Sequence, residues 1–308
     1  MPTVRGDRPT ISIVGPGRLG TALAINLRKA GWKIGCLVMR SRERVSRDVS
    51  LLARQTNARI IELDKETIPR GLVWITVPDD AIAGVAARLA QSQYWRGSIV
   101  FHSSGALTSD VLVPLHDRGA KVASVHPGMT FVRKTVPSLS GVPFGLEGDA
   151  GAIRLAKKIV ASVGATAFTL RKENKVLYHA FDTFASPLFI ALMAALEETG
   201  HAAGIPRARV RVMAGPLLRQ TLSNYLEHGA AAAFSGPLIR GDVATIRGHL
   251  HAMKVAPVAR AAYVALARVA VKELPVKNRT ALKNLLRELS DQRLKAATLR
   301  DRMVLTDC

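Results

Sequence analysis

The chain has 308 residues, of which 48% are apolar and 22% charged, a globular composition with room for two domains. This composition excludes a disordered chain, a collagen-like repeat and a coiled coil. The net charge of +21 raises the question of nucleic acid, a membrane surface or phosphate-bearing ligands. The charges are scattered and only 5% of the residues are aromatic, so the composition disfavours a nucleic-acid partner.

No segment of the sequence predicts a membrane span or a signal peptide. The richest apolar run, residues 185–196, is 12 residues long and contains Ser186 and Pro187, whereas a span needs about 18 residues. The first apolar run, 11–14, is too short for the core of a signal peptide. The two cysteines, Cys36 and Cys308, offer neither a disulfide framework nor metal-ligand spacing. We therefore expect a cytoplasmic protein without a metal.

Short apolar runs alternate with helical patterns through the first half of the chain. Strands are predicted over residues 11–14, 34–39, 60–63, 72–77, 98–101, 122–125, 143–146 and 165–170. Helices are predicted over 18–31, 46–56, 79–89 and 150–163. This alternation is typical of βαβ units. It predicts an α/β fold with a Rossmann-like, doubly wound parallel sheet.

After Arg171 the pattern becomes purely helical. The predicted helices span residues 176–203, 210–228, 243–251, 258–272 and 280–289. We therefore predict two domains, 9–172 with the sheet and 173–308 with an all-α fold. Long apolar stretches at 188–196 and 261–271 exceed what one copy is expected to bury, so we expect a homodimer formed through the helical domain.

A glycine-rich loop follows the first predicted strand. Gly15, Gly17 and Gly20, with Arg18 and Leu19 between them, form a G-x-G-x-x-G pattern that opens a helix. The first glycine permits a tight turn, the second lets the backbone approach a pyrophosphate, and the third allows close packing of the helix. Free N–H groups at the helix N-terminus favour the anion. The loop predicts dinucleotide binding, and the alternative is a tight turn without a ligand.

The end of the second predicted strand indicates which dinucleotide binds. NAD binding uses an acid at this point to hold the ribose 2′-hydroxyl. Here the sequence has Arg40, Ser41 and Arg42, with no acid before Glu43. Two guanidinium groups and a hydroxyl suit a 2′-phosphate, so we predict NADP. The alternative is an exposed basic turn in a basic protein.

Three strand ends carry candidate ligand-binding residues, because ligands of such sheets sit outside the carboxyl ends of the strands. Val77 and Pro78 stand at the end of the fourth strand and are expected at the cofactor. Ser103, Ser104 and Gly105 follow the fifth strand and could bind a substrate carboxylate or carbonyl. They could equally cap a turn. His126 ends the sixth strand, where it could bind substrate and donate a proton, or merely cap the strand.

The helical half holds the remaining candidates. Lys175 and His179 are four residues apart and project from one helix face, where they could transfer a proton. The alternative is a solvated lysine and a core histidine. Arg240 could clamp an anionic substrate or pair with a buried acid. His249 and His251 face different ways on a helix, which disfavours a metal site.

Taken together, these stretches resemble a bacterial two-domain family. The resemblance rests on residues 15–20, 102–107, 126–127, 175–179 and 236–242 and extends from about residue 9 to residue 290. In that family a Rossmann-like NADP-binding domain precedes the helical domain of unknown function 2520. The resemblance implies an NADP-dependent oxidoreductase and names no substrate.

More distantly, the chain resembles 3-hydroxyacid and 6-phosphogluconate dehydrogenases and pyrroline-5-carboxylate reductase. Ser104 and Gly105 match a substrate-binding Ser-Gly-Gly, from which Ala106 departs. Lys175 matches a catalytic lysine, and His179 stands where an asparagine is expected. We therefore expect hydride transfer between NADP(H) and a C–O or C–N carbon of a small, anionic substrate. The alternatives are a non-catalytic NADP-binding sensor and, less favoured, a nucleic-acid-binding protein.

Overall fold

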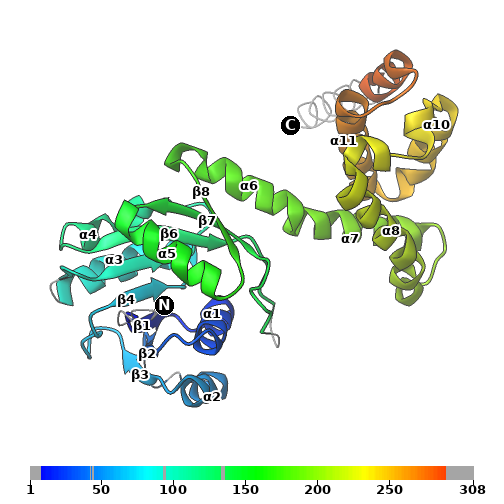
Figure 1. The fold of residues 1–308 in the computed structure, drawn as a ribbon. Helices are drawn as coiled ribbons and strands as arrows, with labels where there is room; N and C mark the ends of the chain where they lie inside the picture. The colour runs from blue at the N-terminus through cyan, green and yellow to red at the C-terminus, as the bar shows by residue number, and fades with distance from the viewer. Residues whose placement is uncertain (1–7, 42, 44, 93–94, 133–135, 289–308) are drawn as a thin grey trace, which may run out of the picture. The chain divides into compact units, whose positions relative to one another are not determined.

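The computed structural model describes residues 8–41, 43, 45–92, 95–132 and 136–288 (Figure 1). The chain forms two compact units, Met1–Ser186 and Pro187–Cys308, and each is described by itself. The boundary between the units therefore lies after Ser186, later in the sequence than the predicted boundary at residue 172, where the strand pattern ends. The difference arises because the first helix of the helical half packs against the sheet of the first unit.

The described residues of the first unit form a sheet of eight strands. The strands are β1 Ile11–Val14, β2 Ile34–Met39, β3 Arg59–Glu62, β4 Leu72–Ile75, β5 Ile99–His102, β6 Lys121–Pro127, β7 Pro143–Gly148 and β8 Thr166–Thr169. Their order is β3-β2-β1-β4-β5-β6-β7-β8. Every neighbouring pair is parallel except β6 and β7. The predicted Rossmann-like fold is confirmed, except that β7 and β8 run antiparallel to the other six strands, which the prediction of a parallel sheet lacks.

The direction of β7 follows from the connection before it. A parallel neighbour needs a crossover, which is usually a helix. The described residues between Pro127 and Pro143 contain no helix, so β7 turns back beside β6. Elsewhere the register aligns the strand ends: Val14 pairs with both Val38 and Ile75. The carboxyl ends of β1, β2 and β4 therefore lie along one edge of the sheet.

Helices cover both faces of the sheet. They are α1 Arg18–Lys29, α2 Arg47–Thr56, α3 Asp79–Ser92, α4 Val113–His116 and α5 Ala150–Ser162, with short 3-10 turns at Ser109–Leu112 and Lys172–Asn174. Leu23 and Leu27 of α1, four residues apart, are buried with Ile13 in one core cluster. Val14 points to the opposite face, into a second cluster with Ile82 of α3. This two-sided burial is the doubly wound arrangement.

The predicted helix over 176–203 is two helices, α6 Lys175–Ala185 and α7 Pro187–Ala202. Ser186 leaves the helical conformation with φ −129° and ψ −80°, and Pro187 begins the next helix because proline is tolerated in a first turn. Within the described residues, the stretch Lys172–Ala202 is long and apolar enough to cross a membrane by length and composition alone, which is weak evidence of a span. The sequence analysis predicts none.

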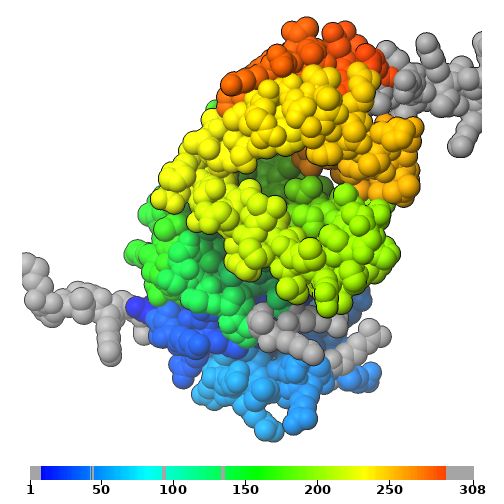
Figure 2. Space-filling model, turned by 90° about the vertical axis from the view of Figure 1, so that its right-hand side faces the viewer, coloured from blue at the N-terminus to red at the C-terminus, as the bar shows by residue number. Residues whose placement is uncertain are grey.

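The second unit is entirely helical in its described part. After α7 come α8 Arg207–Ala233, α9 Pro237–Arg240, α10 Val243–Ala252, a 3-10 turn at Met253–Val255, α11 Pro257–Glu273 and a helix over 279–288. Gly229 interrupts α8 with φ 78°. A cavity of about 930 Å³, lined by apolar side chains of α7, α8, α10 and α11, opens on this unit. Figure 2 shows its surface hollowed among the lime, yellow and orange parts.

Candidate active site

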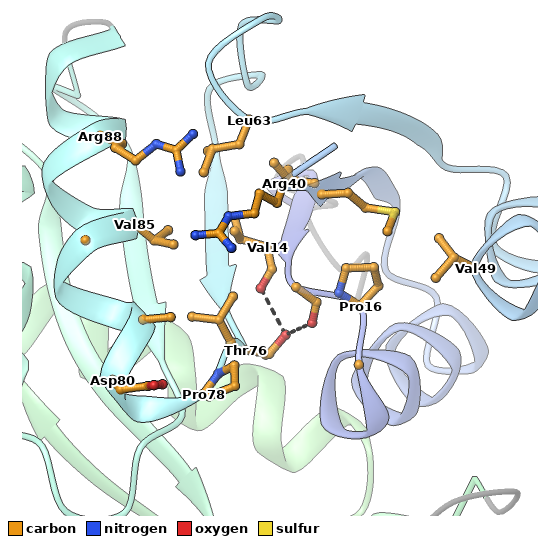
Figure 3. Close-up of a pocket in the computed structure, with 17 residues that line it drawn as sticks. Val14, Pro16, Arg40, Val49, Leu63, Thr76, Pro78, Asp80, Val85 and Arg88 are labelled. Atoms are coloured by element: carbon orange, nitrogen blue, oxygen red, sulfur yellow. Dashed lines mark hydrogen bonds between the residues drawn. The ribbon is translucent and has the colours of Figure 1, made fainter. Parts of the chain in front are cut away.

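The glycine-rich loop borders a cavity of about 920 Å³ at the carboxyl ends of β1, β2 and β4 (Figure 3). Gly15 follows β1 with φ +84°, a conformation that favours glycine. Thr76, just after β4, donates its hydroxyl to the carbonyl oxygens of Val14 at 3.1 Å and Gly15 at 2.7 Å. The hydroxyl of Thr76 therefore fixes the start of the loop against the neighbouring strand.

The loop leaves room for an anion at the N-terminus of α1. Gly17 is the N-cap of α1, and no side chain caps it. A Cβ on Gly17 would meet nothing closer than the Gly15 carbonyl oxygen at 4.0 Å, so a side chain here would occupy the cavity. A glycine loop with an uncapped helix N-terminus suits the pyrophosphate of a dinucleotide. Gly20 is buried in the first turn of α1, whereas Arg18 is exposed there and Leu19 is partly buried.

The cavity also holds positive charge. Arg40, which follows β2, projects into it (Figure 3). Ser41 accepts a hydrogen bond from the backbone N–H of Glu43 at 3.3 Å, and Arg42 lies outside the described residues. Val77 and Pro78 line the cavity. Arg88 of α3 lines the cavity as well and pairs with Asp64. Arg88 could not be predicted from the sequence, because neither side chain of this pair stands near a motif.

A second cluster of candidate residues begins in the loop after β5. Side-chain hydrogen bonds keep this loop in place. The indole of Trp74 donates to the Ser103 hydroxyl at 2.8 Å. The Ser104 hydroxyl donates to Asp79 at 2.6 Å and accepts from the Leu107 N–H at 2.9 Å. Both hydroxyls are thus engaged within the protein, as the capped-turn alternative requires.

His102 holds the same loop from the end of β5. Burial lowers its pKa to about 3, and the charge of Lys175 adds to this effect. The imidazole is therefore neutral at physiological pH. Its Nδ1 accepts from the Ser104 N–H at 3.1 Å, so Nε2 carries the proton and donates to the Thr108 carbonyl oxygen at 3.1 Å. His102 is a structural residue of the loop.

Lys175 is fully enclosed, with an exposed fraction of 0%. It is therefore not a solvated residue at a helix start. Its Nζ donates to the Ser104 carbonyl oxygen at 2.9 Å. Burial lowers the pKa of Lys175 to about 8, against the opposing attraction of Glu147, Asp79 and Asp182. The ammonium group thus ties the start of α6 to the loop after β5.

His126 meets two further side chains of α6. Its Nδ1 lies 3.0 Å from the Tyr178 hydroxyl and 3.5 Å from Asp182 Oδ2. Burial lowers the pKa of His126 to about 4, and the charges of Lys175 and His179 contribute. Burial raises the pKa of both Tyr178 and Asp182. Tyr178 and Asp182 have no predicted role, although their spacing from Lys175, three and seven residues, places all three on one helix face.

His179 and His126 both lie against Gly105. A Cβ on Gly105 would collide with His179 Cδ2 and come within 2.9 Å of His126 Nε2. The two imidazole rings stand edge to face, 6.0 Å apart. The structure thus brings together five predicted residues, namely Ser104, Gly105, His126, Lys175 and His179. Arg240 ends α9 in the second unit and is exposed.

The buried lysine predicts how stability depends on pH. Its pKa is about 8 in the folded protein and 10.5 in its reference state, so the unfolded chain binds more protons between these values. The free energy of unfolding should therefore rise through this window, by about 2 kcal/mol between about pH 7 and 9.5. Urea unfolding of the wild type at both pH values should show the rise, and Lys175→Met should lack it. The exposed Lys29→Met is the control, and an equal rise in Lys175→Met would contradict the burial of the charge.

Comparisons with known proteins address the family. Residues 2–127 match the model of a Rossmann-like domain, and residues 142–270 match the model of a domain of unknown function, DUF2520. A search of curated proteins finds no match. A solved structure from Bacteroides fragilis is that of a protein described, by inference, as an NADP oxidoreductase. It is 21% identical to this chain, with a TM-score of 0.69, over 85% of this chain and 97% of that one.

Two other solved structures share the fold. A Thermotoga maritima protein is 24% identical with a TM-score of 0.67, over 84% of this chain and 96% of that one. A reductive aminase from Aspergillus terreus, in complex with NADPH and ethyl-5-oxohexanoate, is 17% identical with a TM-score of 0.62, over 90% and 99%. These matches and the two domain models confirm the resemblance in the sequence. The chain combines a Rossmann-like domain with a DUF2520 domain.

Proposed function

We propose that this protein is an NADP(H)-dependent oxidoreductase that transfers hydride between the nicotinamide and a C–O or C–N carbon of a small, anionic substrate. One observation carries the proposal. A dinucleotide-sized cavity with a glycine loop and a cluster of ionisable side chains both stand at the carboxyl ends of one sheet, within one compact unit. The bound NADPH of the Aspergillus terreus reductive aminase supports the choice of cofactor.

The residues of the glycine loop cavity would hold NADP. The backbone from Gly15 to Gly20 and the N-terminus of α1 would bind the pyrophosphate. Arg40, with Ser41 and Arg42 after it, would bind the 2′-phosphate through charge-assisted hydrogen bonds. Val77 and Pro78 would contact the nucleotide from the end of β4. When bound, the cofactor supplies the hydride or accepts it.

The cluster at α6 would bind and orient the substrate. We assign substrate contacts to Ser103, Ser104, Gly105 and His126, an electrostatic role to Lys175 and proton transfer to His179. Lys175 is enclosed and bonded to Ser104, so it would act through its charge, which favours an anionic substrate. His179 is partly exposed beside Gly105 and would be the group of this pair that contacts the substrate.

The direct test is a substrate screen. NADPH oxidation is measured with the purified protein against ketoacids, aldehydes and cyclic imines, and NADH serves as the comparison cofactor. We expect steady NADPH oxidation with at least one member of these classes. A protein that binds NADPH but oxidises it with none of them would overturn the proposal in favour of a non-catalytic role. Retention on DNA that weakens with salt would favour nucleic-acid binding instead.

A homodimer formed through the helical unit is part of this proposal. Leu217 and Leu226 of α8 are 71% and 74% exposed, and Val269 of α11 is 57% exposed. Apolar surface of this extent is typical of interfaces. A second copy related by two-fold symmetry is the default occupant. A cytoplasmic location is also proposed, because Cys36 is a free, buried thiol.

We expect sedimentation velocity at micromolar concentration to give a dimer. The double substitution Leu217→Glu with Leu226→Glu should shift it to the monomer, because it buries two charges in the interface. Leu51→Glu, an exposed leucine on α2, is the matched control and should leave the dimer intact. A wild-type monomer at this concentration would refute the assembly.

A further inference from the structure

His126 stands between two different environments. On the Nδ1 side lie the hydroxyl of Tyr178 at 3.0 Å and Asp182 Oδ2 at 3.5 Å. On the Nε2 side lies the space over Gly105, where a Cβ would come within 2.9 Å of Nε2. A neutral imidazole carries one proton, on either Nδ1 or Nε2. The Nδ1 side therefore decides what the ring presents over Gly105.

The groups on the Nδ1 side accept hydrogen bonds. The side chains of Tyr178 and Asp182 interact, and because a carboxylate can only accept, the Tyr178 hydroxyl is the donor of this pair; the contact opposes the burial that raises the pKa of Asp182. The phenol oxygen is then free to accept a proton from Nδ1. Asp182 Oδ2 is itself buried and has no hydrogen-bond partner in the described part of the chain. Both oxygens thus favour a proton on Nδ1.

The tyrosine is held in place by its surroundings. Its ring lies edge to face with His126 at 5.6 Å and with Phe168 at 5.7 Å. A Cβ on Gly145 would come within 3.2 Å of the tyrosine ring, so the glycine in β7 makes space for it. The contact between Tyr178 and His126 is therefore fixed by packing on both sides.

We infer that Tyr178 and Asp182 are positioning residues that hold His126 as the Nδ1–H tautomer, so that its Nε2 presents a lone pair to the substrate. A lone pair binds a donor. The substrate atom at His126 therefore carries a hydrogen, as an amine or iminium N–H or a hydroxyl does, and is not a carbonyl or carboxylate oxygen. This polarity is the reverse of the proton donation that the sequence left open for His126. The substrate part of this inference rests on the proposed function, and the tautomer does not.

The protonation state supports a single tautomer across the working range. Burial lowers the pKa of His126 to about 4, and the charges of Lys175 and His179 on α6 contribute. His102 of β5, which also faces His126, is itself neutral. The Asp182 carboxylate opposes this shift from the Nδ1 side. The ring should thus remain neutral from about pH 6 to 8.

The tautomer can be measured without a substrate. Protein labelled with ¹⁵N-histidine is examined by long-range ¹H–¹⁵N correlation NMR, which separates protonated from unprotonated ring nitrogens. His126→Gln identifies the His126 signals by their loss. We expect the Nδ1–H pattern from about pH 6 to 8. Tyr178→Phe and Asp182→Asn should each lose this pattern in favour of a mixture of tautomers.

Tyr263→Phe is the matched control, because it removes a tyrosine hydroxyl that contacts His249 Nδ1 at 3.1 Å in the other unit. It should leave the His126 signals unchanged. An Nε2–H tautomer in the wild type, or a titration near the ordinary histidine pKa of about 6.5, would overturn the inference. Retention of the Nδ1–H pattern in both variants would do so too. Should Tyr178→Phe fail to fold, Asp182→Asn decides.

The substrate class is tested with two rings of equal size in the presence of NADP. Pyrrolidine carries an N–H donor, whereas cyclopentanone carries only an acceptor. We expect pyrrolidine to shift the Nε2 resonance saturably at concentrations where cyclopentanone does not. A preference for cyclopentanone, or no response to either, would overturn the substrate class. A failed NADPH oxidation screen would instead remove the proposed function and leave the tautomer result standing.

Discussion

At least one of the substitutions His179→Ala and Lys175→Met is expected to lower kcat about a hundredfold or more, because general acid–base catalysis contributes about 10²–10⁴-fold. We expect the larger loss from His179→Ala, since His179 lies partly exposed against Gly105 while Lys175 is enclosed. Both variants should keep the Kd for NADPH within about threefold of the wild type, since ordinary surface substitutions have small effects. Steady-state kinetics and NADPH titration measure the two quantities.

The control for this experiment is His116→Ala, an exposed histidine on α4 of the same unit. It should change neither kcat nor the affinity for NADPH. A core histidine without a catalytic role would instead lower the melting temperature and leave kcat per folded molecule unchanged. Wild-type turnover in both His179→Ala and Lys175→Met would move the search for the proton-transfer group to His126.

Arg40→Glu is expected to abolish the preference for NADPH over NADH. The guanidinium group projects into the cavity, where it would pair with the 2′-phosphate. Loss of one charge-assisted hydrogen bond, worth about 1.5–3 kcal/mol, should weaken NADPH binding by about ten- to a hundredfold. Glutamate would repel the phosphate and could accept from a 2′-hydroxyl, so NADH binding should not weaken. Titration of both cofactors against both proteins gives the ratio of affinities.

Arg54→Glu makes the same change of charge on the exposed side of α2 and should leave the ratio unaltered. This control separates a specific contact from the general attraction of a basic protein for an anion. The prediction fails if the wild type binds NADH as tightly as NADPH. In that case Arg88, the other arginine that lines the cavity, would not bind the 2′-phosphate either.

The sequence predicts the sheet unit well because its signals are local. A few consecutive residues are enough to predict the glycine loop, the strand and helix that flank it, and the position of Arg40 after β2. The direction of β7 depends on the path of the connection from Pro127, which carries no periodic pattern. The helix break at Ser186 could not be predicted either, because the sequence is apolar both before and after it.

The candidate cluster at α6 could be predicted only in part. The four-residue spacing of Lys175 and His179 places them on one face, and the structure places both beside the loop after β5. Lys175 and His179 differ in burial because they pack to different depths against the loop after β5. No local sequence pattern encodes this packing. The roles of Tyr178 and Asp182 depend on His126, more than 50 residues earlier in the chain. Such long-range pairs leave no trace in one sequence.

The end of α6 at Ser186 has an evolutionary consequence. The glycine loop, Arg40 and the α6 cluster all precede this residue and fold in one compact unit. Recombination after Ser186 could therefore exchange the helical unit and leave both the cofactor loop and the histidines with the same continuous stretch of chain. Related proteins could acquire a new helical unit in a single genetic event, and the residues assigned to the reaction would be inherited intact while assembly diverged.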